Sequence, residues 1–197
     1  MFNVVDVGFN SIFLKANKDL FHLLKKFNLE YKEIQKYLLK SENQIKKLYD
    51  KKKQRFVNYD LKNNKKINVP SITNYFILFA DLKNKMINYK IIQNLKKHNS
   101  RKKFFFSSIK PNYNKYEEKR YWRGPVWINC NWIIYQGLKD KDKKFAKMVR
   151  NKTIDLVKKN GFYEYFNTNT GKAYGAKNFS WTASLFLDLI LEKNIIN

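Results

Sequence analysis

The stretch YWRGPVWINCNW, residues 121–132, gathers three tryptophans, a tyrosine, an arginine and two asparagines into twelve positions. Within it, Gly124-Pro125 predicts a break followed by a helix from residue 126, because proline is tolerated in the first turn of a helix. On this helix Trp127 and Asn131 share a face, since residues four apart are neighbours on a helical surface. The helix is apolar on nearly all sides, which is typical of a helix buried inside a fold.

Two interpretations of these twelve residues are open from the residues alone. The rings could be core side chains whose polar tips are satisfied by hydrogen bonds. Alternatively, the rings, the arginine and the amides could form one wall of a binding site, because a packed core does not need Arg123 and a solvated loop does not need three tryptophans.

A second unusual stretch is GFYEYFNTNTGKAYGAKNFSWTA, residues 161–183, in which Glu164 lies among four aromatic residues. A carboxylate in apolar surroundings has its charged form disfavoured, which suits it to proton transfer near neutral pH. The same glutamate could instead be a surface residue on an alternating strand. Flat rings beside a carboxylate are what carbohydrate binding needs, because sugar faces stack on rings and sugar hydroxyls pair with acids and amides.

The composition allows a sizeable core, with 44% hydrophobic and 17% aromatic residues in 197 positions. The net charge of +25, from 41 basic and 16 acidic residues, suggests an anionic partner such as nucleic acid. However, only five of the basic residues are arginines, and the lysines are spread along the chain. We therefore do not expect nucleic-acid binding, although a basic helical protein using HNSRKKFFFSSIK (98–110) is kept as an alternative.

Several classes of site and location are disfavoured. Cys130 is the single cysteine, so no internal disulfide forms, and His22 and His98 lie in different segments without neighbouring ligands. We therefore expect no metal, no cofactor and no Ser/His/Asp chemistry. No run approaches the roughly eighteen apolar residues of a membrane span, so no membrane partner is expected. The localisation is not specified by the sequence, and would be cytoplasmic if Met1 is the true start.

Hydrophobic periodicity predicts a helical chain with one short β-hairpin. Two long segments, 99–125 and 160–178, read as irregular, and their aromatic content makes them functional candidates rather than disordered loops. The hairpin is expected within 53–69, and helices are expected at 9–27, 30–50, 73–81, 84–97, 126–138, 141–159 and 179–192.

Together, YWRGPVWINCNWIIYQGL, GFYEYFNTNTG and FSWTA resemble the C-terminal catalytic region of glycoside hydrolase family 63 and its relatives. This group includes processing α-glucosidase I and the mannosylglycerate and glucosylglycerate hydrolases. The start of the chain, VVDVGFNSIFLKAN, resembles the family's DPGFNA helix, and RFVNYDLKNNKKI resembles its FYDYDLETGK hairpin. The resemblance thus covers nearly the whole chain.

The resemblance implies an all-α fold, an incomplete (α/α)6 toroid of about seven helices, with residues 1–197 forming the C-terminal half of the catalytic domain. It implies an inverting hydrolase that cleaves an α-linked glucoside or mannoside, without a cofactor. Glu164 matches the position of the family's general base. The matching substrate-binding positions are Tyr121, Trp122 and Trp127, with supporting roles for Arg123, Asn131 and Trp181.

The family's general acid is an aspartate in a GWDNSP-like motif upstream of the DPGFNA helix, and no WDNS occurs in this sequence. The resemblance therefore implies a partner, an N-terminal half that supplies the catalytic aspartate. Resident carboxylates are not expected to replace it: Asp6 is more simply a helix N-cap, Asp60 fits a hairpin turn, and Glu117-Glu118 looks solvated. The alternative is a catalytically inactive carbohydrate-binding or degenerate module.

Overall fold

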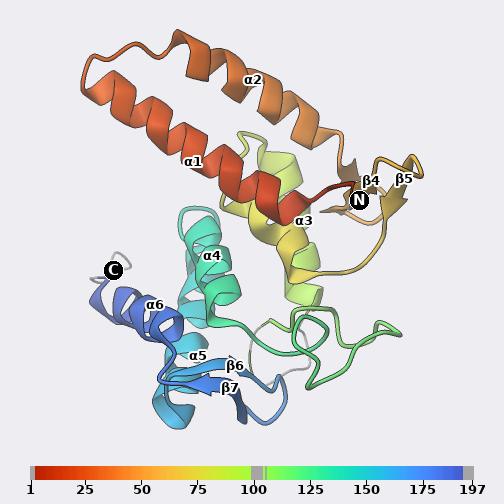
Figure 1. Ribbon diagram of the computed structural model, residues 1–197, viewed down its shortest axis with the longest axis vertical. Coiled ribbons are helices and arrows are strands. Elements are labelled where there is room, and N and C mark those ends of the chain that lie inside the picture. The colour runs from red at the N-terminus through yellow and green to blue at the C-terminus, as the bar shows by residue number, and fades with distance from the viewer. Residues whose placement is uncertain (1–2, 99–103, 105, 193–197) are drawn as a thin grey trace. The chain divides into compact units, whose positions relative to one another are not determined.

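The computed structural model describes residues 3–98, 104 and 106–192. The chain forms two compact units, Met1–Val69 with Asn74–Ile92, and Pro70–Thr73 with Gln93–Asn197. Helices dominate both units, and short strands accompany them (Figure 1). The helical part of the expected fold is therefore confirmed. Of the basic segment 98–110, residues 99–103 and 105 lie outside the described part of the chain.

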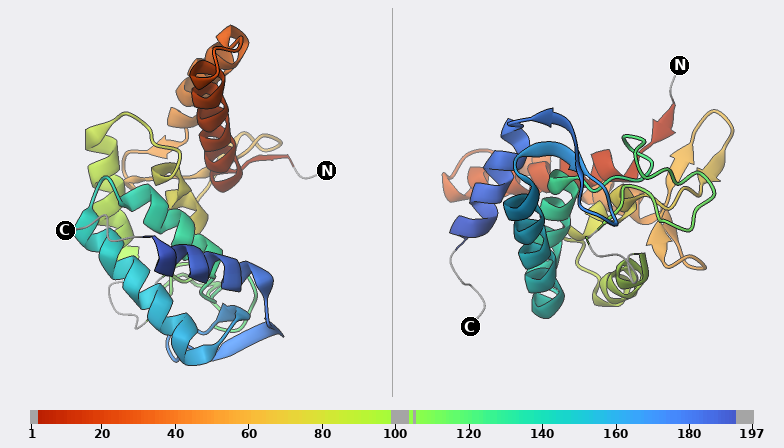
Figure 2. Two further views of the ribbon diagram at one scale, coloured as in Figure 1. Left: turned by 90° about the vertical axis from the view of Figure 1, so that its left-hand side faces the viewer. Right: turned by 90° about the horizontal axis from the view of Figure 1, so that it is seen from below.

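The first unit is built on a helical hairpin of α1 (Val7–Lys26) and α2 (Lys32–Lys46), which lie side by side in Figures 1 and 2. Asp6 is the N-cap of α1, since its carboxylate accepts the Phe9 N–H at 2.7 Å. Its other oxygen accepts from the Asn58 side chain at 2.7 Å, which anchors the start of α1 to a strand. The prediction that Asp6 is a helix cap is thus confirmed.

Short strands accompany this helical hairpin. The predicted hairpin is present, and its turn is held by Asp60, whose carboxylate accepts from the backbone and side chain of Asn63 at 3.0 and 2.7 Å. The sequence predicted a single hairpin, but the described residues contain three small antiparallel sheets. In the first unit these are β1 (Val4–Val5), β4 (Asn58–Asp60) and β5 (Lys65–Ile67) in the order β1-β4-β5, and the pair β2 (Tyr49–Asp50) and β3 (Arg55–Phe56).

Two helices have residues in both units. η1 (Ile72–Leu78) is a 3₁₀-helix where a helix over 73–81 was expected, and α3 (Lys85–His98) matches the expected helix over 84–97. With seven residues, η1 is longer than most 3₁₀ segments.

Among its described residues, the second unit contains three complete helices and a β-hairpin, besides the last residues of α3. Asp142 caps α5 by accepting the Phe145 N–H at 3.0 Å, and Gly161 ends that helix with φ of 84°. The hydrophobic core of this unit includes Phe104, Val126, Ile128, Leu156, Val157 and Phe166. The elements are α4 (Ile128–Leu138), α5 (Lys143–Asn160), β6 (Tyr163–Phe166), β7 (Ala173–Lys177) and α6 (Ser180–Leu191).

The start of α4 differs from the prediction in an informative way. The backbone of Val126 pairs with that of Phe166 through two hydrogen bonds of 2.8 and 2.9 Å, so the chain is still extended there. Trp127 is consequently the N-cap, with φ of −117° and ψ of 130°, and not a helical residue. The segment 160–178, expected to be irregular, forms the β6–β7 hairpin that supplies this pairing.

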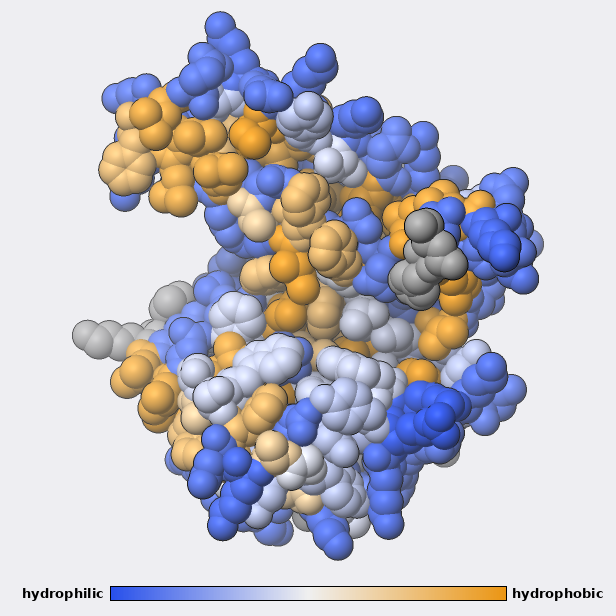
Figure 3. Space-filling view, viewed as in Figure 1, coloured by the Kyte–Doolittle hydropathy of each residue, from blue (hydrophilic) through white to orange (hydrophobic). Residues whose placement is uncertain are grey.

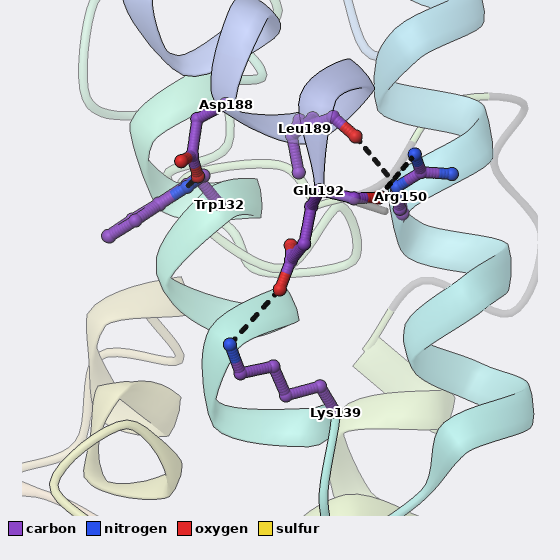
Figure 4. Close-up of polar contacts among 6 residues, drawn as sticks. All are labelled: Trp132, Lys139, Arg150, Asp188, Leu189 and Glu192. Atoms are coloured by element: carbon purple, nitrogen blue, oxygen red, sulfur yellow. Dashed lines mark hydrogen bonds and ion pairs between the residues drawn. The ribbon is translucent and has the colours of Figure 1, made fainter. Parts of the chain in front are cut away.

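Polar contacts join the three helices of the second unit (Figure 4). The Arg150 guanidinium of α5 donates to the Leu189 carbonyl at 2.8 Å, and so binds one of the last carbonyls of α6. Lys139 pairs with Glu192 at 3.1 Å, and the Trp132 indole N–H donates to Asp188. Both ends of α6 are therefore fixed, because Thr182 in its first turn also donates to the Tyr163 carbonyl at 2.7 Å.

Candidate functional site

Glu164 lies at an irregularity in the β6–β7 hairpin. The register shifts between Tyr163, which opposes Lys177, and Tyr165, which opposes Tyr174. Gly175 and Ala176 of β7 therefore lie opposite the single residue Glu164 of β6, which is the pattern of a β-bulge in β7. The carboxylate of Glu164 lies over these two residues, and one of its oxygens accepts the Ala176 N–H at 3.2 Å.

Gly175 makes room for this carboxylate. Its φ is 74°, and a Cβ at this position would lie 2.4 Å from Glu164 Oε2 and 2.7 Å from Glu164 Cβ. Both the backbone conformation and the close approach favour glycine. The bulge and the glycine together therefore determine where the half-buried carboxylate lies.

The second oxygen of Glu164 accepts a hydrogen bond from the Tyr121 hydroxyl, which comes from the distant loop before α4. This hydrogen bond raises the pKa of Tyr121 above its ordinary value, and the protonated hydroxyl is the donor to the carboxylate. Each oxygen of the carboxylate thus has one donor, the Tyr121 hydroxyl or the Ala176 N–H. A carboxylate oxygen has more than one lone-pair site, so both oxygens keep the capacity to accept from a further group such as water.

Five rings beside Glu164 form an aromatic cluster: Tyr121, Trp122, Trp127, Tyr165 and Tyr174. Trp127 is at its centre and is 2% exposed, whereas Tyr121 and Trp122 are 47% and 44% exposed. Trp122 stacks on Trp127 with ring centroids 4.2 Å apart and planes 6° apart, and Tyr121 meets Trp127 edge-on at 4.8 Å. The cluster therefore presents wide, partly exposed ring surface next to a carboxylate.

The loop that carries Tyr121 and Trp122 is fixed by its backbone. A Cβ on Gly124 would lie 2.0 Å from the Glu117 carbonyl oxygen, so only glycine fits at position 124 where the two chain segments meet. The Gly124 N–H donates to Ser108 at 3.0 Å, and the Arg123 carbonyl accepts from the Glu117 N–H at 2.9 Å. The Arg123 guanidinium also pairs with the Glu117 carboxylate at 3.1 Å, which turns it towards its own loop.

A second carboxylate, Glu118, joins this loop to the hairpin that carries Glu164. Its two oxygens accept from the side-chain amides of Asn167, at 3.3 Å, and Asn169 in the β6–β7 turn. Thr168 of the same turn donates to the Gly124 carbonyl at 2.7 Å. The ring-bearing loop and the hairpin therefore form one connected structure.

Two other residues predicted from the sequence, Asn131 and Trp181, are not part of the aromatic cluster. Asn131 is buried, and its amide donates to the Thr153 hydroxyl at 3.0 Å between α4 and α5. Trp181 is 45% exposed on the first turn of α6, with its ring 6.3 Å from that of Phe179. The geometry thus groups Glu164 with Tyr121, Trp122 and Trp127, and gives Arg123 and Asn131 contacts that shape the surrounding scaffold.

The sequence did not identify three residues of this site, which are Tyr165, Tyr174 and Gly175. Tyr165 was seen only as an aromatic neighbour of Glu164, yet its ring stacks near Trp127 at 5.1 Å. The signal for the other two was the Tyr-Gly pair in AYGAK, an aromatic residue beside a glycine in an otherwise ordinary strand.

The other carboxylates considered from the sequence have structural contacts. Asp6 caps a helix, Asp60 holds a turn, Glu117 pairs with Arg123 and Glu118 accepts from the hairpin amides. The hydrogen bonds from Asn63 lower the pKa of Asp60. Within residues 3–98, 104 and 106–192, no three His, Cys, Asp or Glu side chains gather as a metal site, and no helix is both long and apolar enough to span a membrane.

Comparison with known proteins identifies the family of the chain. The model of the mannosylglycerate hydrolase MGH1-like glycoside hydrolase domain matches residues 1–182. Mannosylglycerate hydrolases from Thermus thermophilus and Rubrobacter radiotolerans are 32% and 30% identical, over 94% and 97% of this chain. A crystal structure of a family 63 mannosylglycerate hydrolase from Thermus thermophilus superposes with a TM-score of 0.90 and 31% identity over 93% of this chain. The chain spans only 45% of each of these three proteins.

Proposed function

The chain belongs to the family of mannosylglycerate hydrolase MGH1-like glycoside hydrolases, and we propose that it is the C-terminal half of an inverting enzyme. The complete enzyme would be an (α/α)6 toroid that cleaves an α-linked glucoside or mannoside. The observation that carries this proposal is the Glu164 carboxylate, held by the Tyr121 hydroxyl and the Ala176 N–H beside the aromatic cluster.

In this proposal Glu164 is the general base. Its carboxylate takes a proton from a water molecule, whose oxygen attacks the anomeric carbon as the glycosidic bond breaks. A general acid on the opposite side of the sugar protonates the leaving oxygen, so the products are a free sugar and an alcohol. The two carboxyl groups of inverting enzymes lie roughly 6.5–9.5 Å apart, which leaves space for the water.

We propose that the general acid is an aspartate supplied by residues outside these 197. Two findings support this. The relatives are about twice as long as the matched region. The four carboxylates that could have replaced the acid, Asp6, Asp60, Glu117 and Glu118, have the structural partners described above.

The exposed rings of Tyr121 and Trp122 would bind the sugar through its apolar face. For the leaving group we favour glycerate, because the relatives are named mannosylglycerate hydrolases and one structure of the Thermus protein was determined in complex with Tris and D-glycerate. The excess of lysine in this chain also suits an anionic leaving group.

The test uses the part of the Thermus thermophilus enzyme that this chain does not match, produced as a separate complementary polypeptide. The two polypeptides are co-expressed, and glycerate release from mannosylglycerate and glucosylglycerate is measured. Glu164→Gln should lower the rate by about 10²–10⁴-fold, the usual contribution of a general base. The control Glu33→Gln, at an exposed position in the first turn of α2, should leave the rate unchanged.

A second candidate is an inactive carbohydrate-binding module. It is favoured because the carboxylates that could have served as a general acid, such as Glu117 and Glu118, form ion pairs or hydrogen bonds within the chain. It predicts sugar binding without hydrolysis in the same co-expression experiment. Hydrolysis that is insensitive to Glu164→Gln would contradict both candidates.

A further inference from the structure

The first long helix of the chain is apolar on two faces. One face, with Val7, Ser11 and Leu14, is buried in the first unit. The other carries six residues at alternating spacings of four and three, which place them in one line along the helix. We call this line the α1 stripe; it consists of Phe9, Phe13, Ala16, Leu20, Leu23 and Phe27.

The α1 stripe is open to solvent along its whole length. Phe9 and Phe27, at its two ends, are 71% and 63% exposed, and Leu23 is 49% exposed. The rings of Phe9 and Phe13 lie parallel with centroids 6.4 Å apart, which makes the first part of the stripe a flat apolar surface. Figure 3 shows apolar side chains gathered along α1. Continuous exposed apolar surface of this kind marks an interaction site in most proteins.

A cavity adjoins the stripe within the same unit. It has a volume of about 650 Å³ and lies among α1, α2 and the neighbouring strands. Phe13 belongs both to the stripe and to the lining, together with Leu14, Tyr37 and Ile45. The cavity is therefore a recess in the same apolar surface, with room for more than one large side chain of a partner.

The last described helix, α6, also carries exposed apolar side chains. Leu187, Ile190 and Leu191 of α6 are 50%, 40% and 72% exposed. By contrast, α4, which lies between these helices in the chain, buries eight of its eleven residues. Exposed apolar side chains are thus present on the first and on the last described helix.

Charge argues against a second copy of this chain as the partner. Each chain carries a net charge of +25, so pairing two stripes would bring two strongly positive molecules together. The relatives, in contrast, contain more than half of their length outside the matched region. A segment of that length is long enough to cover the α1 stripe.

We infer that the α1 stripe, with its adjoining cavity, is the surface that binds the other half of the enzyme. This inference rests on the proposed function, since it assigns a place on this chain to the partner that completes the toroid. The partner offers apolar helical side chains, at least one of which enters the cavity.

The experiment measures association without any substrate. The purified chain and the complementary polypeptide from the Thermus enzyme are mixed, and the mass and dissociation constant of the complex are determined by light scattering and calorimetry. Leu23→Glu should raise the dissociation constant at least about tenfold, because it places a charge in an apolar contact. The matched control is Leu61→Glu, a residue that is 52% exposed in the β4–β5 turn and outside the stripe.

A one-to-one complex that Leu23→Glu weakens and Leu61→Glu does not is the expected result. Equal effects of the two substitutions, a stripe-dependent homodimer, or no complex with the folded wild-type chain would each overturn the inference. Circular dichroism of both variants establishes that they fold. A stripe-dependent complex without hydrolysis would contradict the proposed function alone, whereas hydrolysis and association insensitive to Leu23→Glu would contradict this interface alone.

Discussion

Replacing Gly175 by alanine tests whether the bulge and the glycine position Glu164. The new Cβ would lie 2.4 Å from Glu164 Oε2 and 2.7 Å from Glu164 Cβ, so the carboxylate must move. As it moves, it gives up the Ala176 N–H, which it now accepts at 3.2 Å. The substitution therefore affects both folding stability and the orientation of the base.

Two terms contribute to the loss of stability. Alanine with φ near the observed 74° costs about 1–2 kcal/mol, the usual penalty of a left-handed conformation. Relieving the overlap adds about 1–2 kcal/mol, the lower part of the range for overpacking, because Glu164 is only half-buried and its side chain can move. We expect Gly175→Ala to lower the free energy of unfolding by about 2–4 kcal/mol.

Gly161→Ala is a control for a positive-φ glycine whose new Cβ overlaps no neighbouring atom. Its φ of 84° is similar, but the nearest atom to its new Cβ is on the Tyr163 ring at 3.8 Å, an ordinary contact. Its ψ of −175° lies in a region that essentially only glycine adopts, so the backbone conformation alone should cost about 1–3 kcal/mol. Urea unfolding followed by circular dichroism gives both values.

A double-mutant cycle isolates the overlap. In a Glu164→Gly background, the two closest atoms are absent, and Gly175→Ala should cost less than in the wild-type background, by at least about 0.5 kcal/mol. Gly161→Ala should show no coupling to Glu164, and the same absence of coupling for Gly175→Ala would refute the positioning role of Gly175.

Three further predictions concern the second unit. Asp142→Ala removes the cap of α5 and should lower the free energy of unfolding by about 1–2 kcal/mol at pH 7. Burial alone would raise the pKa of Asp142, but the Lys96 ammonium and the Phe145 N–H outweigh burial and lower this pKa. The difference in the free energy of unfolding between wild type and variant, measured in urea, should therefore disappear as the pH falls through the lowered pKa. A difference that persists in acid would contradict the role of the charged carboxylate. Burial raises the pKa of the Cys130 thiol to about 12, so at pH 8 native protein should react with a disulfide reagent about 10³-fold more slowly than urea-unfolded protein, and equal rates would show that α4 is open. Gly124→Ala should destabilise the chain by about 2–3 kcal/mol and change tryptophan fluorescence, since the loop that stacks one tryptophan on another must move; an unchanged spectrum would contradict that packing.

The helices were predictable because their apolar residues recur with a helical period and their ends carry local signals. Asp6 before an apolar run and Gly161 after one identify the limits of two helices. The β6–β7 hairpin was not predictable in this way. Its turn, NTNTG, reads as an irregular segment, and its strands are short, so the pairing depends on the distant contact between Val126 and Phe166.

The candidate site was predicted in part. The resemblance to family 63 singled out Glu164 and Tyr121, which are 43 residues apart and are joined by a hydrogen bond in the structure. Gly175 could not be found from spacing, because its closeness to Glu164 follows from a shift of strand register. The pairing of Arg123 with Glu117 was equally hidden, since it depends on how tightly the loop closes at Gly124.

The central claim is that Glu164 activates a water molecule in a single displacement at the anomeric carbon. The most direct measurement is proton NMR of the sugar first released from α-mannosylglycerate by the chain and its complementary polypeptide, recorded before mutarotation. A single displacement predicts that the β-anomer appears first, and that Glu164→Gln suppresses its formation. Release of the α-anomer would mean a covalent intermediate and a retaining mechanism, and would contradict the assignment of Glu164 as a general base.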